Sequence, residues 1–238
     1  MKLILSCILL ICCLSRNAKA GIIFESDFES GLGTQFTGQG FIDGTQGYSA
    51  YGFGNNFLRN NSGNGTGNGI SLTLSNLPTH DSVSVDFLLA VIDSWDGVGN
   101  QVHGPDGWSV AIDGTTIFSY VFENSNSGNQ TYVPPAGVTL ARRTDLGFAG
   151  PGGFFRDSAY DMSLDTSFEN IAHTSSTLTV TWFRHSGLQI NSSTFVDESW
   201  AIDNLRVSLG GVAAVPEPSS LLTVAGLFLL GLRGRQRA

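Results

Sequence analysis

Residues 83–91 read Val-Ser-Val-Asp-Phe-Leu-Leu-Ala-Val and have the period of a β-strand. Apolar side chains occupy every second position, and Ser84 and Asp86 lie between them. Further along, Leu88 and Ala90 make the second side apolar as well. Because successive side chains of a strand point to opposite faces, both faces of this strand are expected to be partly buried. Such a strand is typical of the inside of a two-sheet sandwich.

The same alternation recurs on both sides of this segment, in residues 70–74, 108–112, 178–182 and 199–209. Asp113-Gly114 follows residues 108–112 and is a typical hairpin turn. No amphipathic helix of useful length interrupts these segments. The pattern therefore predicts an all-β domain built as a two-sheet β-sandwich, with a core large enough to be stable without disulfides.

The composition supports this fold class and disfavours some functions. Only 13% of the 238 residues are charged and 30 are glycine, which is typical of an all-β extracellular module rather than a helical enzyme. Residues 21–215 contain 6 basic and 19 acidic residues, a net charge of −13, and no lysine. A domain this acidic lacks the basic surface that phosphate backbones require, so we expect no nucleic acid among its partners.

The first twenty residues have the pattern of a signal peptide. A basic start is followed by the apolar run Leu3–Leu14 and by Ala18-Lys19-Ala20, the small residues that precede a cleavage site. The alternative is a membrane-spanning helix, but a run of about 12 residues is short of the roughly 20 that a span needs. All three cysteines lie in this segment, so the exported chain would contain no thiol.

The C-terminal tail consists of a Pro-Glu-Pro motif, an apolar run and an arginine-rich end: Pro216, Glu217, Pro218, residues 221–232, then Arg233, Arg235 and Arg237. These parts together resemble the PEP-CTERM sorting signal of Gram-negative bacteria. The resemblance implies transient anchoring in the inner membrane, cleavage by an exosortase, and final location at the cell surface or outside the cell. The alternative is an ordinary anchor that is not processed. The predicted organisation is signal peptide 1–20, β-sandwich domain 21–212 and sorting tail 213–238.

The two ends of the domain resemble those of known jelly-roll modules. Residues 27–31 read Asp-Phe-Glu-Ser-Gly, and residues 200–204 read Trp-Ala-Ile-Asp-Asn. A start and an end of this kind are similar to those of MAM-type and carbohydrate-binding modules. The resemblance implies a jelly-roll-like sandwich whose first and last strands lie side by side.

Acidic residues accompany both ends. Glu25, Asp27 and Glu29 occur at every second position, so an extended chain would place all three carboxylates on one face. Hard oxygen ligands of this kind suit Ca²⁺, and Asp203 would supply a further oxygen ligand from the neighbouring strand. The jelly-roll resemblance implies a structural Ca²⁺ with Asp27, Glu29 and Asp203 as its ligands. The alternative is a solvated acidic face without a metal.

The same acidic run matches the E-x-D-x-E arrangement of laminarinase-like β-glucanases. In an extended chain the outer carboxylates would be some 13 Å apart along the backbone, far from the ~5.5 Å of a retaining pair. No G-x-S-x-G or H-E-x-x-H motif occurs, and the four histidines have no metal-ligand spacing in sequence. We therefore expect no enzymatic activity, with a glycoside hydrolase as the alternative.

A glycine-rich loop contains Asp93, Asp96, Asn100 and Asp106 without the register of a dedicated calcium loop. Calcium binding and simple loop solubility both remain open there. Trp95 is either a flat platform for a sugar ring or a buried anchor of the loop.

These observations together indicate an exported, non-enzymatic β-sandwich. Its expected location is the cell surface or the extracellular matrix, and its expected partners are an exosortase-type protease and exopolysaccharide or another envelope component. A purely structural biofilm protein is the other non-enzymatic interpretation.

Overall fold

The computed structural model describes residues 21–62, 65–98, 105–125, 129–148, 156–186 and 198–211. Within these ranges the larger sheet contains eight strands: β1 (Gly21–Ser26), β3 (Gly40–Gly44), β4 (Asn56–Asn60), β6 (Ser82–Asp93), β9 (Thr139–Thr144), β10 (Asp157–Asp161), β11 (Ile171–Ala172) and β13 (Glu198–Gly210). The smaller sheet contains β2 (Phe36–Gly38), β5 (Ile70–Ser75), β7 (Gly107–Ile112), β8 (Thr115–Val121) and β12 (Thr177–Ser186). Short 3₁₀ turns connect them: η1 (Gln46–Tyr51), η2 (Thr66–Asn68), η3 (Met162–Leu164) and η4 (Thr166–Phe168).

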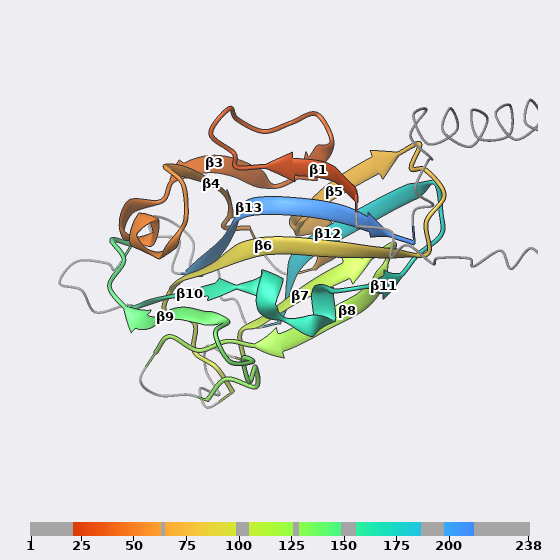
Figure 1. The fold of residues 1–238 in the computed structure, drawn as a ribbon. Helices are drawn as coiled ribbons and strands as arrows, with labels where there is room; N and C mark the ends of the chain where they lie inside the picture. Colours follow the sequence, from red (N-terminus) through yellow and green to blue (C-terminus); the bar gives the residue numbers. More distant parts are fainter. Residues whose placement is uncertain are drawn as a thin grey trace, which may run out of the picture.

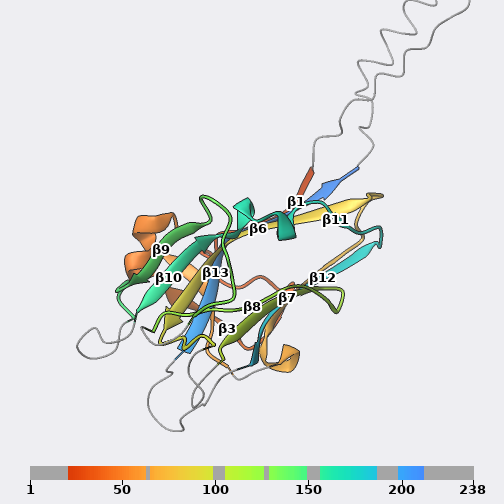
Figure 2. The ribbon, with the colours of Figure 1, turned by 90° about the horizontal axis from the view of Figure 1, so that it is seen from below.

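The two sheets form a sandwich, as the alternating segments predict. The larger sheet runs in the order β3-β4-β13-β6-β10-β9, and the smaller one in the order β2-β5-β12-β7-β8. All strand pairs are antiparallel. In Figures 1 and 2, β6 and β13 lie in one layer and β7, β8 and β12 in the other. The predicted β-sandwich is therefore confirmed.

The space between the sheets is filled largely by aromatic side chains. Trp108, Trp182 and Trp200 are fully buried there, in a cluster that also contains Phe87 and Phe118. Their rings contact one another mostly edge to face, for example Trp108 and Trp200 at 5.8 Å between centroids. Burial of such large side chains stabilises a fold that has no disulfide within its described residues.

A second apolar cluster lies on the outer face of the larger sheet. Leu88 and Ile92 of β6 point away from the main core there, and Tyr48, Phe53 and Phe57 cover them from η1 and the segment that follows it. This explains why the second side of residues 83–91 becomes apolar beyond Asp86. The outer face of β6 is thus covered at one end and open at the other.

The strands beside β13 and β6 are discontinuous. On one edge of β13, β4 pairs with residues 200–202 and β1 with residues 205–209. On the far edge of β6, β10 pairs with residues 88–91 and β11 only with residues 82–83. The middle of β13 and β6 is therefore flanked by strand ends rather than by continuous strands.

The predicted strand segments are confirmed. Residues 70–74 lie in β5, 83–91 in β6, 108–112 in β7, 178–182 in β12 and 199–209 in β13. Asp113 and Gly114 both have positive φ, 48° and 80°, as a type I′ hairpin between β7 and β8 requires. The first and last strands, β1 and β13, lie side by side in an antiparallel pair, as the jelly-roll resemblance implies.

The two predicted targeting segments lie outside the described residues. They are the signal peptide 1–20 and the sorting tail 213–238 with its Pro-Glu-Pro motif and arginines. In the part of the chain that the structure does describe, no helix is long and apolar enough to cross a membrane.

Candidate functional site

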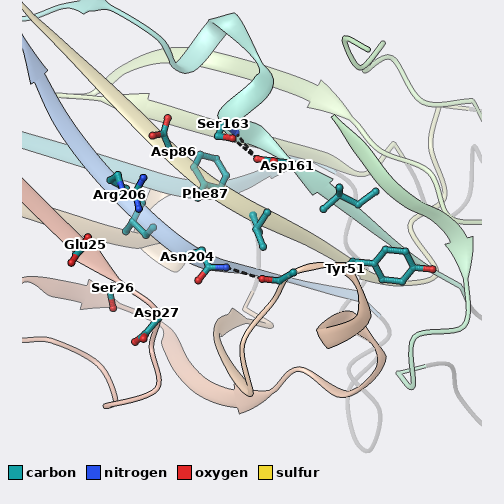
Figure 3. Close-up of a pocket in the computed structure, with 14 residues that line it drawn as sticks. Glu25, Ser26, Asp27, Tyr51, Asp86, Phe87, Asp161, Ser163, Asn204 and Arg206 are labelled. Atoms are coloured by element: carbon teal, nitrogen blue, oxygen red, sulfur yellow. Dashed lines mark hydrogen bonds between the residues drawn. The ribbon is translucent and has the colours of Figure 1, made fainter. Parts of the chain in front are cut away.

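A cleft of about 790 Å³ lies on the outer face of the larger sheet, over the middle of β13 and β6 (Figure 3). Strand ends and turns form its walls, because the neighbouring strands stop there. It is lined by Glu25, Ser26, Asp27, Tyr51, Gly52, Asp86, Phe87, Leu88, Leu140, Asp161, Ser163, Asn204, Leu205 and Arg206. Its size is within the range of small-molecule and oligosaccharide sites.

A β-bulge in β13 shapes the floor of the cleft. Asp203 pairs with Leu88 and Arg206 with Asp86, so β13 uses one residue more than β6 over this interval. Asn204 lies in the bulge with a left-handed φ of 49°. Extra residues of this kind bend a strand and often lie beside functional sites.

The bulge also changes which residues of β13 face outward. Ile202 before the bulge and Leu205 after it both pack between the sheets, although their separation is odd. Arg206 consequently points to the outer face and is exposed. The side-chain Nδ2 of Asn204 donates a hydrogen bond of 2.8 Å to the carbonyl oxygen of Gly52, which ties the loop after η1 to the rim of the cleft (Figure 3).

Three charged residues form a row across the floor. Glu25 of β1 lies opposite Arg206 of β13, and Arg206 lies opposite Asp86 of β6, so all three share the outer face. None of them makes an ion pair within 4.0 Å or a side-chain hydrogen bond in the part of the chain described. Burial raises the pKa of the half-buried Asp86; Arg206 opposes this rise, and the carboxylates of Glu169 and Asp161 add to it.

The other wall combines a polar turn with apolar surface. Asp161 caps η3 through its Oδ1, which accepts hydrogen bonds from the backbone nitrogen and the hydroxyl of Ser163 at 3.1 and 2.6 Å. Leu88, Leu140 and the half-buried Tyr51 supply apolar surface beside these polar groups. The cleft therefore offers carboxylate, amide and guanidinium groups next to an apolar patch.

Our expectation that Glu25, Asp27 and Glu29 share one extended face is wrong beyond Ser26. Strand β1 ends at Ser26, and Phe28 has a left-handed φ of 57° that directs its ring into the core. The Oδ1 of Asp27 accepts a hydrogen bond of 3.1 Å from the backbone nitrogen of Glu29, which closes the turn. The E-x-D-x-E spacing therefore does not describe a continuous strand, and the hydrolase argument drawn from that strand loses its basis.

The turn nevertheless brings Glu29 close to Asp203, as the calcium prediction requires. Both carboxylates accept hydrogen bonds from one loop: Asp203 from the backbone nitrogen of Gly54 at 2.8 Å, and Glu29 from the backbone nitrogens of Asn55 and of Asn56, the latter at 3.0 Å. These contacts lower the pKa of Glu29, the one with Asn56 most strongly, and this favours its ionised form.

Asp203 is fully buried at this point. Burial raises its pKa to about 6; the backbone nitrogens of Gly54 and Asn204 oppose the rise, and the negative charges of Glu29 and Asp27 add to it. None of the three carboxylates has a basic ion-pair partner within 4.0 Å in the described ranges. The three carboxylates lie near one another beside the cleft, but no set of oxygens with one from each residue comes within 4.8 Å of one another. Whether they draw together around Ca²⁺ stays a prediction.

A different acidic group lies near the loop that contains Asp93, Asp96 and Asp106. Carboxylate oxygens of Asp96, Asp106 and Glu198 lie within 4.8 Å of one another. Arg184 is fully buried beside them, with Nη2 at 2.5 Å from Glu198 Oε2 and 3.7 Å from Asp106 Oδ1. Burial raises the pKa of Asp106 to about 6. The sequence had no signal for Arg184, which already supplies a cation here, and Asn100 lies outside the described residues.

Trp95 is a buried anchor and not a platform for a sugar. It is completely buried, and its Nε1 donates hydrogen bonds to the carbonyl oxygens of Ile92 and Ser199 at 3.1 and 3.0 Å. Its ring also packs against Arg184, whose Cζ is 4.8 Å from the ring centroid. This contact holds the guanidinium in place beside the carboxylates.

Two histidines that are far apart in sequence meet at the other end of the sandwich. His80 Nε2 and His173 Nδ1 are 2.6 Å apart in nearly parallel rings. The opposite nitrogens face acceptors: His80 Nδ1 donates to the carbonyl oxygen of Pro78, and His173 Nε2 donates to Asp113 Oδ2 at 2.9 Å.

Comparisons with known proteins find likeness at the level of structure only. No family model and no curated protein matches the chain. The xylan-binding CBM22-1 domain of Paenibacillus barcinonensis Xyn10C matches with a TM-score of 0.38 and 17% identity, over 82% of this chain and 99% of that domain. The K2 cleaved adhesin domain of Lys-gingipain matches with a TM-score of 0.38 and 17% identity, over 79% of this chain and 98% of that domain. The CBM22-1-GH10 modules of Clostridium thermocellum Xyn10B match with a TM-score of 0.35 and 9% identity, over 84% of this chain and 30% of that protein. These scores and identities are too low to place the chain in any of these groups or to transfer a ligand to it.

Proposed function

We propose that this chain is an exported, non-catalytic β-sandwich that binds a polysaccharide of the cell envelope or matrix in the cleft over β13 and β6. The cleft itself is the observation that carries this proposal. A sugar presents hydroxyl groups around its ring and apolar C–H surface on its faces. Carboxylate, amide and guanidinium groups beside an apolar patch complement both kinds of surface.

The residues have distinct parts in such binding. Arg206 and Asn204 would donate hydrogen bonds to ring and hydroxyl oxygens, and Glu25 and Asp86 would accept them from hydroxyl groups. Tyr51 and Leu140 would pack against the apolar face of the ring. Since the loop at Gly52 is already tied to Asn204, little of the site has to be ordered when a glycan binds.

The proposal is tested by affinity electrophoresis of the full-length chain in gels that contain the source strain's own exopolysaccharide. We expect retardation of the wild type, and at least about tenfold weaker binding for Tyr51→Ala and Arg206→Ala. Asp145→Asn, at an exposed residue that does not line the cleft, should bind normally. Normal binding by both cleft variants would refute the assignment of this site.

Two further assays separate the alternatives. Release of reducing sugar that disappears in Glu25→Gln would favour a glycoside hydrolase over a binding module. Absence of both binding and turnover, together with an altered biofilm after deletion of the protein, would favour a purely structural role.

A structural Ca²⁺ at Asp27, Glu29 and Asp203 is part of the proposal. The donor set suits a hard cation because it offers only oxygen atoms. Burial is the main cause of the raised pKa of Asp203, and the negative charges of Glu29 and Asp27 add to it. The ion would offset that repulsion and fix the turn after β1 against the loop at Gly54. It would thereby hold the rim of the cleft in place.

Export and sorting complete the proposal. The PEP-CTERM resemblance of residues 213–238 supports transient insertion in the inner membrane and cleavage by an exosortase near Pro216, Glu217 and Pro218. Intact-mass measurement on protein from the native cell should give a chain that lacks about 20 residues at each end. A chain in the cytosol with both ends intact would contradict this part.

A further inference from the structure

The charge of the cleft is one-sided. Besides Asp27 of the proposed Ca²⁺ site, Glu25, Asp86 and Asp161 contribute three carboxylates to its lining, whereas Arg206 contributes the one basic side chain among the lining residues described. Residues 21–215 contain no lysine and carry a net charge of −13, so the rest of the domain does not balance this charge. A polyanionic glycan would be repelled from such a site.

Asp86 is a half-buried carboxylate of the cleft without a hydrogen-bond donor among the described residues. It lies in the middle of β6. Its pKa is raised mainly by burial, and Arg206 only partly opposes this rise. A half-buried carboxylate without donors costs folding free energy. A ligand that brings a positive charge to Asp86 would offset that cost, whereas a ligand that brings only hydroxyl groups would offset less of it.

Glu25 lies in the same row on the other side of Arg206. Two strand spacings separate Glu25 from Asp86, so their backbones are about 10 Å apart. That separation is too large for both carboxylates to engage one charged group on a ligand. It suits a chain molecule that presents charged groups at intervals.

We infer that the cleft selects a glycan with free, protonated amino groups, that is, a polymer containing amino sugars without N-acetyl groups. The inference rests on the proposed function and names the substrate class of that site. Each ammonium group has three donors and one positive charge, which matches carboxylates that lack partners. Arg206 lies between the two carboxylates and keeps them from attracting one cation jointly, while it donates to the sugar oxygens.

The inference is tested by calorimetric titration of the full-length chain with three hexasaccharides: fully deacetylated glucosamine, N-acetylglucosamine and a neutral xylo-oligosaccharide. We expect the deacetylated oligomer to bind about tenfold more tightly than the acetylated one at low salt, with the difference shrinking as salt screens it. Below the pH at which the ligand's amines are fully protonated, its affinity should fall with decreasing pH, because protonation of Asp86, whose pKa burial raises, removes the charge that the ammonium groups require.

Charge-neutralising variants locate the effect. Asp86→Asn and Glu25→Gln should each lose most of the preference for the deacetylated oligomer, because the amide removes the negative charge. Affinity for the acetylated oligomer should fall much less, because the amide oxygen still accepts hydrogen bonds from hydroxyl groups. Asp81→Asn removes the same charge at an exposed residue outside the cleft and should keep the full preference. Asn at position 86 removes a destabilising charge, so this variant should fold, and its melting temperature checks that it does.

The outcomes separate the inference from the proposed function. Equal binding of the three oligomers, abolished by Tyr51→Ala, would leave the glycan site standing and overturn amine selectivity. An equal loss of preference in Asp81→Asn would also overturn it, because general acidity would then explain the binding. Binding of none of the oligomers and of no native exopolysaccharide would overturn both.

Discussion

At the scale of single residues, Asp203 links fold stability to pH. Its pKa is about 6 in the folded protein against an ordinary 3.8, so the folded state holds this proton more tightly than the unfolded state does. The resulting stabilisation is complete below about pH 4 and is lost as pH rises through 6. Above that pH the ionised, buried carboxylate lowers the free energy of unfolding unless a cation is bound.

Asp203→Asn should therefore gain stability relative to the wild type as the pH rises from 4 to 7. The expected change in the difference of unfolding free energy is on the order of 1–3 kcal/mol, measured by urea unfolding without divalent cations. The variant keeps one oxygen for the backbone nitrogen of Gly54 or Asn204, so its stability at pH 4 sets the baseline. A difference that does not vary with pH would contradict the raised pKa.

At the scale of one element, the bulge in β13 determines the shape of the cleft. Asn204 adopts a left-handed φ of 49° and bonds to Gly52 through its side chain. Asn204→Ala should lose about 1–3 kcal/mol of unfolding free energy, because alanine pays the left-handed strain and cannot make the bond. Asn204→Gly is the matched control: glycine relieves the strain of the left-handed φ but, like alanine, cannot make the hydrogen bond to Gly52. It should therefore be about 1 kcal/mol more stable than Asn204→Ala. Equal stability of the two variants in urea unfolding would show that the backbone strain is unimportant.

The same element shows why the sequence predicts the strands but not the site. Long segments such as residues 83–91 alternate cleanly, and their strands follow from the pattern alone. Short strands such as β10 (Asp157–Asp161) have no such pattern in sequence. Hydrogen bonding to β6 holds β10 in the extended conformation instead. Asp86 and Arg206 share a rung only because β13 lies beside β6 with a bulge between them. That contact depends on strand order, which no local pattern contains.

The residues predicted to bind Ca²⁺ show which part of the local geometry follows from the sequence. Residues 27–31 and 200–204 resemble jelly-roll ends, and the side-by-side strands bring Glu29 and Asp203 to the same loop. The assumption of an extended chain was wrong because Phe28 leaves the strand to enter the core. A buried apolar side chain thus overrides alternation at the end of a strand.

At the scale of the whole molecule, the net charge of −13 on residues 21–215 makes stability depend on ionic strength. Mutual repulsion destabilises the compact state, so added NaCl should raise the melting temperature by a few degrees through screening. A specific site would add to this. At a hundredfold excess over its dissociation constant, Ca²⁺ would contribute about 2.7 kcal/mol, which corresponds to roughly 5–10 °C for a domain of this size.

Screening and site binding can be told apart by comparing Ca²⁺ with Mg²⁺ and NaCl at equal ionic strength in thermal melts of the wild type and Glu29→Gln. We expect the additional rise only with Ca²⁺ and only in the wild type, because the smaller Mg²⁺ keeps its waters and demands octahedral geometry. The variant should retain the rise with NaCl, since its net charge changes by only one unit. Equal responses to both divalent ions, or a calcium response that survives in Glu29→Gln, would mean that the acidic surface attracts cations in general and that the rim of the cleft is held by hydrogen bonds alone.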